Sequence, residues 1–155
     1  MKLNPETDLQ ITRSLKAPRA LLWRCWTTPD HLKAFFMPEP HRLDACDVDL
    51  RPGGRFDTVL VVDGARIENR GVFLEVVPET RLVFTDTYSE GWAPAPDPFM
   101  TAILDFADAG AGETAYTATV RHRSAEARQT HEDMGFFSGW GTVATQLEAY
   151  ARSQM

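Results

Sequence analysis

The stretch HEDMGFFSGWGTVATQLEAY, residues 131–150, has apolar side chains at the spacing of an amphipathic helix. At about 100° per residue, four of them form one stripe that must be buried: Phe136, Trp140, Val143 and Leu147. The same stretch holds three glycines in seven residues: Gly135, Gly139 and Gly141. Each interior glycine costs a helix about 0.5–1 kcal/mol relative to alanine. We therefore expect one long helix over residues 124–152, in which the glycines serve a purpose that offsets this cost.

A position above a curved sheet would explain the glycines. A strongly curled antiparallel sheet has a concave face that a single helix cannot fill, so an apolar cavity remains beneath the helix. Glycines then let the helix approach the sheet closely at some points, while bulky neighbours fill others. The alternative is that the glycines only relieve crowding in a fully packed core, or contact a partner subunit. The sequence leaves both explanations open.

The N-terminal part of the chain predicts a strand followed by helices. Residues 8–16, DLQITRSLK, alternate apolar and polar side chains as a strand does. Pro18 begins the segment PRALLWRCWTT, and proline suits the first turn of a helix. A second helix is expected in TTPDHLKAFF, where Thr28 is the expected N-cap and Pro29 lies in the first turn. We therefore expect two short helices between the first and second strands.

Further strands follow at hairpin spacing up to about residue 123. They are expected at residues 41–50, 55–62, 65–77, 81–88, 99–106 and 113–123. Asp63-Gly64 is a strong hairpin signal, and Gly71 is the expected site of a β-bulge. The pattern predicts a curved seven-stranded antiparallel sheet and a C-terminal helix of more than twenty residues. Residues 1–155 would then form one two-layer α+β domain.

Composition and charge exclude several classes of partner. Hydrophobic residues make up 43% of the chain and charged residues 25%, as in soluble globular proteins, and the net charge is −6. Lys and Arg form no block, so we expect neither nucleic acid nor an anionic membrane as a partner. No apolar run is long enough to span a bilayer, and MKLNPETDLQ is not a secretory signal. We expect a cytoplasmic protein without membrane insertion, in which Cys25 and Cys46 stay reduced.

Five stretches of the chain, in this order, resemble a known family. They are APRALLWRCWTTPDHLKAFF (17–36), RPGGRF (51–56), GVFLEVVPETRLVFTD (71–86), GWAPAPDPFMT (91–101) and HEDMGFFSGWG (131–141). On these stretches the chain resembles the homologues of the C-terminal domain of the heat-shock protein 90 ATPase activator. That family belongs to the START-like, Bet v 1-like or polyketide cyclase (SRPBCC) superfamily. The resemblance implies the helix-grip fold, in which a curved sheet wraps around a long C-terminal helix.

The resemblance implies less about function, because members of this superfamily bind varied apolar ligands or cyclise polyketides. We expect the chain to bind a small apolar molecule in a cavity between the sheet and the C-terminal helix. The alternative is an enzyme of the polyketide cyclase or aromatase type that acts in that cavity. A stress-related, co-chaperone-like interaction module is a weaker alternative, because the chaperone activator has an additional N-terminal domain. Ridges of apolar and small residues also leave room for a homodimer.

Aromatic and methionine side chains occur on every element that could line such a cavity. We expect the ligand to contact twelve residues: Trp26, Phe36, Met37, Phe56, Phe84, Tyr88, Trp92, Met100, His131, Met134, Phe137 and Trp140. The candidates for polar anchors are His131, Asp86, Tyr88 and Tyr116. The loop SEGWAPAPDP, residues 89–98, is expected to act as a gate, with Trp92 as its lid.

No motif in the chain indicates a metal or an organic cofactor, and we expect none. HEDMG begins like a zinc protease motif, but Gly135 stands where the second histidine would be. His122 and His131 are nine residues apart across a predicted strand–helix junction, where we expect capping and hydrogen bonding rather than a metal site. The glycines of RPGG lack the strand-to-helix context of a phosphate loop. No paired acid and base indicates a catalytic site, so we assign no catalytic residue.

Overall fold

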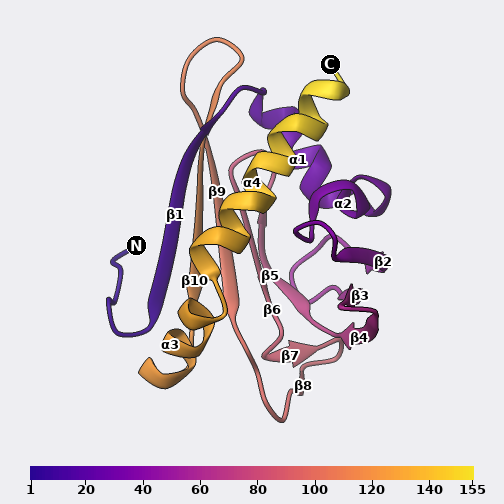
Figure 1. The fold of residues 1–155 in the computed structure, drawn as a ribbon, viewed down its shortest axis with the longest axis vertical. Coiled ribbons are helices and arrows are strands. Elements are labelled where there is room, and N and C mark those ends of the chain that lie inside the picture. The colour runs from indigo at the N-terminus through magenta and orange to yellow at the C-terminus, as the bar shows by residue number, and fades with distance from the viewer.

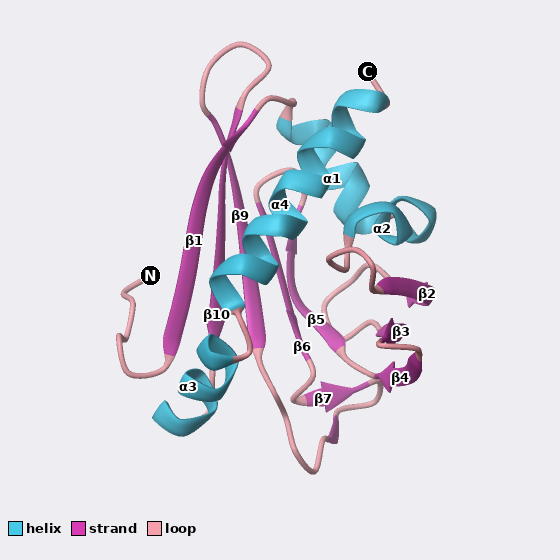
Figure 2. Ribbon diagram, viewed as in Figure 1, coloured by secondary structure: helices cyan, strands magenta, loops and turns pink.

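The computed structural model describes all 155 residues as an α+β fold (Figure 1). It begins with strand β1 (Asp8–Leu15), which is followed by the two short helices expected from sequence, α1 (Arg19–Thr27) and α2 (Pro29–Phe35). Antiparallel strands and turns then alternate up to the C-terminal helices (Figure 2). No helix is both long enough and apolar enough to cross a membrane.

The largest sheet has five antiparallel strands in the order β1–β10–β9–β6–β5. Besides β1, its strands are β5 (Val72–Val77), β6 (Arg81–Thr85), β9 (Thr101–Asp108) and β10 (Thr114–Arg121). β1 pairs with β10 along its whole length, from Asp8 opposite Arg121 to Leu15 opposite Thr114. The first and last strands are therefore neighbours, which places Thr7 beside the start of the C-terminal helices.

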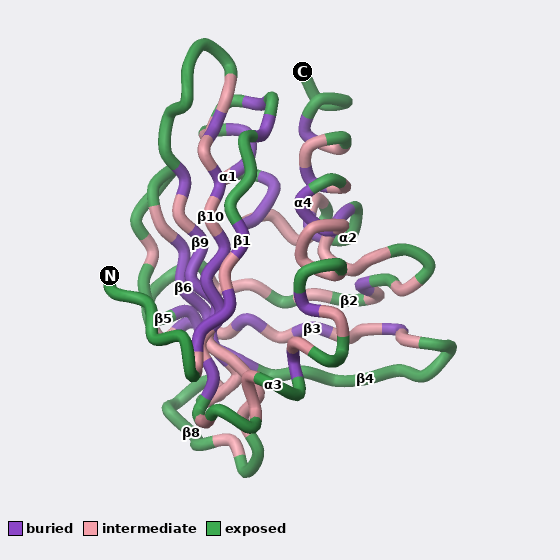
Figure 3. Tube along the Cα trace, turned by 60° about the vertical axis from the view of Figure 1, so that its left-hand side comes forward, coloured by how far each residue is buried: buried purple, intermediate pink, exposed green.

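The prediction of a single seven-stranded sheet is wrong. β2 (Arg42–Val48), β3 (Phe56–Val62) and β4 (Ala65–Asn69) form a separate three-stranded sheet. β7 (Tyr88–Ser89) and β8 (Ala93–Pro94) form a short hairpin inside the predicted gate loop. The expected strand 65–77 is in fact two strands, β4 and β5, which belong to different sheets. Figure 3 shows β2, β3 and β4 running away from the five-stranded sheet.

The break between β4 and β5 lies at Gly71, where the two sheets meet. A Cβ at position 71 would overlap the carbonyl oxygen of Thr85, so glycine is required for this close approach. Across the seam, Phe56 N–H donates to Gly71 O at 2.9 Å and Phe73 N–H donates to Gly54 O at 3.0 Å. The predicted irregularity at Gly71 is therefore a change of sheet rather than a bulge within one strand.

The C-terminal helix is interrupted, so the prediction of one helix over 124–152 is also wrong. α3 (Ala125–Asp133) is followed by α4 (Phe136–Ser153), which has 18 residues rather than more than twenty. Gly135, between the helices, has a φ of 97°, in the left-handed region that other residues rarely adopt. Gly135 therefore separates the two helices, and the helix-interior cost applies only to Gly139 and Gly141.

Two local predictions are confirmed. Ser124 is the N-cap of α3, and its hydroxyl accepts the backbone N–H of Ala127 at 3.0 Å. Asp63 and Gly64 form the turn between β3 and β4 with φ angles of 51° and 81°. Both angles are positive, as a two-residue hairpin turn with the twist of the flanking strands requires.

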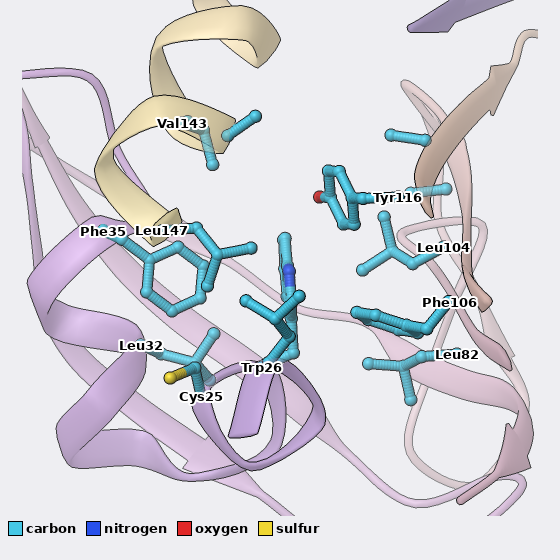
Figure 4. Close-up of a cluster of buried hydrophobic side chains, with 14 of the residues drawn as sticks. Cys25, Trp26, Leu32, Phe35, Leu82, Leu104, Phe106, Tyr116, Val143 and Leu147 are labelled. Atoms are coloured by element: carbon cyan, nitrogen blue, oxygen red, sulfur yellow. The ribbon is translucent and has the colours of Figure 1, made fainter. Parts of the chain in front are cut away.

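The hydrophobic core lies between α4, the short helices and the five-stranded sheet (Figure 4). In Figure 4, Val143 and Leu147 of α4 face Trp26 of α1 and Tyr116 and Leu104 of the sheet. Full burial of one such side chain stabilises a fold by about 1.5–3 kcal/mol. Of the predicted helix stripe, every residue is buried except Trp140, which is only partly buried.

Cys25 and Cys46 are free thiols. Burial raises the pKa of each thiol to about 11, so both are protonated at neutral pH. A protonated, shielded thiol is a poor nucleophile, which argues against a catalytic role for either cysteine.

Candidate functional site

A pocket of about 490 Å³ lies where α3 meets α4, next to the end of α2 and the seam between the two sheets. Fourteen of its 24 lining residues are hydrophobic. Phe136, Trp140 and Val143 line it from α4, and alternate residues of β3 line it from the sheet. The seam at Gly71 also lies on its wall. The pocket is therefore bounded by the seam between the two sheets and by the junction of α3 and α4. These are the two places where the fold differs from the predicted single sheet and single C-terminal helix.

Aromatic rings from the sheets and from the short helices form a connected wall of the pocket. The rings of Phe56 and Phe84 meet edge to face, with 5.0 Å between their centroids. Phe36 packs edge to face on Phe56 and also on Trp26, at 5.9 Å in both cases. Such pairs add about 0.5–1.5 kcal/mol each beyond their area burial. The wall is therefore held in place without a ligand.

Most of the twelve residues expected to contact ligand lie around this pocket. The nine that line it are Trp26, Phe36, Met37, Phe56, Phe84, Met100, His131, Met134 and Trp140. Asp86, one of the candidate polar anchors, lines it as well. Met134 is 70% exposed, so it lies at the mouth, whereas Trp26 and Phe56 are buried.

Three expected residues lie elsewhere: Tyr88, Trp92 and Phe137. Trp92 is 56% exposed, and its ring lies over Gly53, where a Cβ would be 3.0 Å away. Tyr88 packs edge to face on Trp92, with ring centroids 5.8 Å apart. Their hairpin is thus anchored on the turn before β3, and Trp92 does not form a lid in this structure. Phe137 is turned away by the helix and is half exposed.

Several residues that line the pocket were not predicted, although the sequence pattern identifies some of them. Phe56, Thr58, Leu60 and Val62 all line the pocket, because side chains at every second position point to one face of β3. Once Phe56 is assigned to the pocket, this period of two identifies the other three. Phe99 was placed at the start of the expected strand 99–106 and was not among the expected ligand contacts, whereas β9 begins only at Thr101 and Phe99 lies in the loop before it, on the pocket wall.

Two histidines form a hydrogen-bonded pair at the polar end of the pocket. His122 Nδ1 lies 2.8 Å from the carbonyl oxygen of Thr7, and His122 Nε2 lies 2.9 Å from His131 Nδ1. His131 is 8% exposed and packs against the ring of Phe99, with 4.6 Å between centroids. Burial, and then the neighbouring His122, lower the pKa of His131 to about 4, so His131 is neutral at neutral pH. The hydrogen bonding expected for these histidines is therefore present, but neither of them caps α3, whose N-cap is Ser124.

Asp86 ties the loop before β9 to the end of β6. Its carboxylate accepts the backbone N–H of Phe99 at 2.9 Å and that of Met100 at 3.0 Å. These bonds hold both loop residues against the pocket. No Lys or Arg lines the pocket, and Asp86 is its only carboxylate; His41 and His131 also line it.

Tyr116, the remaining candidate anchor, does not line the pocket. It is fully buried, and neither its hydroxyl nor the indole N–H of the buried Trp26 has a hydrogen-bond partner. Burial raises the pKa of Tyr116 far above its usual value, and the nearby indole of Trp26 offsets this only in part. The two groups lie near each other in the core but outside hydrogen-bond geometry, so the burial of each is not fully compensated.

A second hollow of about 390 Å³ lies against β2, β3 and β4. Only three of its nine lining residues are hydrophobic, and it is more open to solvent than the first. Sites for small molecules are concave and mostly apolar, with a few polar groups that fix orientation. The pocket beneath α4 fits this description, and the hollow on the three-stranded sheet does not.

Comparisons with known proteins agree with the fold. The model of a family described as Activator of Hsp90 ATPase homolog 1-like protein matches residues 16–152. The crystal structure of protein NE0264 from Nitrosomonas europaea has a TM-score of 0.94 at 40% identity, over 98% of each chain. Protein Ms6760 from Mycobacterium smegmatis has a TM-score of 0.80 at 26% identity, over 97% of this chain and 94% of its own. No curated protein sequence matches the chain.

The fold extends to more distant structures. The solution structure of an AHSA1-like protein from Aeromonas hydrophila has a TM-score of 0.68 at 18% identity, over 94% of each chain. At this level of identity the likeness concerns the fold alone. The order of one strand, two short helices, antiparallel strands and a C-terminal helix is thus shared well beyond the similar sequences.

Proposed function

The chain belongs to the Activator of Hsp90 ATPase homolog 1-like family, and we propose that it binds a small, largely apolar molecule in the pocket beneath α4. The observation behind this proposal is the pocket lining, in which 14 of 24 residues are hydrophobic. The volume of about 490 Å³ lies within the range of about 300–1,000 Å³ typical of small-molecule sites. A molecule that fits this pocket would be held mainly by the burial of apolar surface.

The arrangement of the aromatic wall supports binding at low cost. Phe56 already contacts both Phe36 and Phe84, so a ligand would not have to order these rings. A site that is formed in advance keeps more of the contact energy as affinity. Met100 and Met134 add flexible apolar side chains that adapt to the shape of the bound molecule.

A second candidate function is an enzyme of the polyketide cyclase or aromatase type. The observation that favours it is His131, a buried and neutral histidine on the pocket wall. A general base works best when its pKa is near the working pH, and the pKa of His131 is lowered to about 4. His131 is therefore a weak base at neutral pH, and binding is the better supported function.

Tryptophan fluorescence tests the proposal directly, because Trp26 and Trp140 line the pocket. We expect saturable quenching with at least one member of a panel of apolar compounds, with a Kd below about 10 μM. Native mass spectrometry of gently purified protein would identify a molecule that is retained from the cell. If no compound in a broad panel binds saturably and the purified protein retains nothing, the proposal is wrong.

A further inference from the structure

The hydrogen bonds of the histidine pair fix which ring nitrogens bear protons. The carbonyl oxygen of Thr7 can only accept, so the proton on His122 must be on Nδ1. When His122 carries that one proton, its Nε2 accepts, and His131 Nδ1 donates to it across 2.9 Å. The remaining nitrogen, His131 Nε2, therefore has a free lone pair.

This lone pair belongs to a buried group on the pocket wall. His131 is more than nine-tenths buried and lines the pocket, and the hydrogen-bond network includes no partner for its Nε2. His131 Nε2 is not among the buried polar atoms that lack a partner, so it is open to solvent, and a ligand hydroxyl that replaces the water there keeps this hydrogen bond whereas an ether loses it. The group that satisfies an imidazole lone pair is a hydrogen-bond donor, such as a hydroxyl.

The charges around the pocket narrow the ligand class further. No Lys or Arg lines the pocket to hold a carboxylate or a phosphate. Asp86 also lines it, and its negative charge opposes an anionic ligand. The carboxylate of Asp86 already accepts the N–H groups of Phe99 and Met100, so it does not need a ligand cation as a partner. A neutral ligand fits these charges best.

We infer that the pocket selects a neutral, mainly apolar molecule with a hydroxyl group, and that this hydroxyl donates to His131 Nε2. This inference rests on the proposed ligand-binding function. It assigns His131 as the polar anchor of the site, with His122 and Thr7 as the groups that position it. The apolar wall then provides most of the affinity. His131 provides the specificity for a hydroxylated molecule over its ether or acid analogue.

Calorimetric titration with three matched probes tests the inference. The probes are 2-naphthol, 2-methoxynaphthalene and 2-naphthoate, which share one ring system and differ in the polar group. In the wild type, we expect 2-naphthol to bind about three- to tenfold more tightly than the methyl ether, as one net hydrogen bond predicts. We expect 2-naphthoate to bind most weakly. If neither neutral probe binds, or if the two bind equally, the hydroxyl inference is overturned; the proposed function fails only if the broad panel described above also shows no saturable binding and the purified protein retains nothing.

Variants assign the effect to His131. In His131→Phe, the preference for 2-naphthol over its methyl ether should disappear, while the ether still binds. His31→Phe is the matched control, because His31 bonds to Tyr150 and does not line the pocket, and it should keep the preference. A preference that survives in His131→Phe would overturn the assignment. So would tighter binding of protonated 2-naphthylmethylamine than of 2-naphthol, since that would identify a cation site.

Imidazole ¹⁵N chemical shifts provide a readout on the wild type if His131→Phe does not fold. Free protein should show an unprotonated Nε2 and a protonated Nδ1 for His131. Adding 2-naphthol should shift the Nε2 resonance, and adding the methyl ether to the same occupancy should leave it nearly unchanged. A protonated Nε2 in the free protein, or equal shifts with both probes, would overturn the inference.

Discussion

The backbone of Gly71 runs directly against the carbonyl oxygen of Thr85, at the point where β4 gives way to β5. A methyl group on residue 71 would overlap that oxygen, which is part of the backbone and cannot rotate away. The contact holds the three-stranded sheet at its angle to the five-stranded sheet. Because Gly71 and Thr85 also line the pocket, the same contact sets the shape of its wall.

Gly71→Ala should therefore lower the unfolding free energy by about 1–3 kcal/mol, the usual cost of overpacking. Urea denaturation followed by circular dichroism measures this change. Gly139→Ala is the control, because a Cβ at position 139 meets nothing within 4 Å, and removing a glycine from a helix stabilises it by about 0.5–1 kcal/mol. Equal stabilities of the two variants would mean that the seam tolerates a side chain.

The sequence predicted which segments are strands and helices better than how they connect. The strand pattern of residues 65–77 is continuous because both β4 and β5 have extended backbones, and alternation does not report a change of sheet. In the same way, helical spacing continues through Gly135, since one left-handed residue redirects a helix without disturbing the pattern on either side. Gly135 follows α3 as glycine often follows a helix end, so this break had a local signal.

Gly139 offers a way to fill the pocket by mutation. It lines the pocket from α4, and the space at its Cβ position is empty. Gly139→Leu should therefore leave the fold intact and weaken binding of the apolar probes at least about tenfold, equivalent to about 1.4 kcal/mol. Gly135→Leu does not test this, because the φ of 97° at Gly135 would strain any side chain.

Gly141→Leu is the matched control for Gly139→Leu. It adds the same side chain to the same helix two positions further on, where the nearest atom is the flexible end of Arg13 and the pocket is absent. Fluorescence titration should show wild-type affinity for this variant. If both leucine variants bind as the wild type does, the ligand lies somewhere other than beneath α4.

The candidate site could be predicted from sequence only where an aromatic residue had a fixed place in an element. Phe56, Phe84 and Trp26 follow from strand or helix position, and all three line the pocket. Trp92 was misplaced because it lies in a loop, where composition shows an aromatic side chain but not the surface on which it packs. The role of His131 in the site depends on its bond to His122, a relation between a strand end and a helix that only the folded chain defines.

Tyr116→Phe should leave the unfolding free energy unchanged or raise it by up to about 1 kcal/mol. The hydroxyl of Tyr116 is fully buried without a partner, so its removal relieves a desolvation cost and keeps the ring. Thr114→Val is a matched control, because the buried Thr114 hydroxyl donates to Ala17 O at 2.7 Å and its loss should cost about 1–3 kcal/mol. A clear loss of stability in Tyr116→Phe would mean that its hydroxyl has a partner, for which the indole N–H of Trp26 is the candidate.

The lowered pKa of His131 predicts a specific dependence of stability on pH. In the unfolded chain, His131 titrates near its ordinary pKa of 6.5, whereas in the folded protein burial and His122 lower this pKa to about 4. Between these two values the unfolded state binds more protons, so the unfolding free energy falls as the pH falls. The contribution of His131 is fully present above about pH 6.5 and is lost by about pH 4.

The expected loss is on the order of 2 kcal/mol, since solvent at the pocket mouth screens part of the effect. Urea denaturation of the wild type and of His131→Phe, at several pH values between about 4 and 7, measures it. Carboxylates contribute to the slope in both proteins, so the quantity to compare is the difference between the two curves. That difference should change steadily across this pH range and be constant above it. Parallel curves would show that His131 titrates alike in the folded and unfolded chains, and would remove the reason for treating it as a neutral anchor.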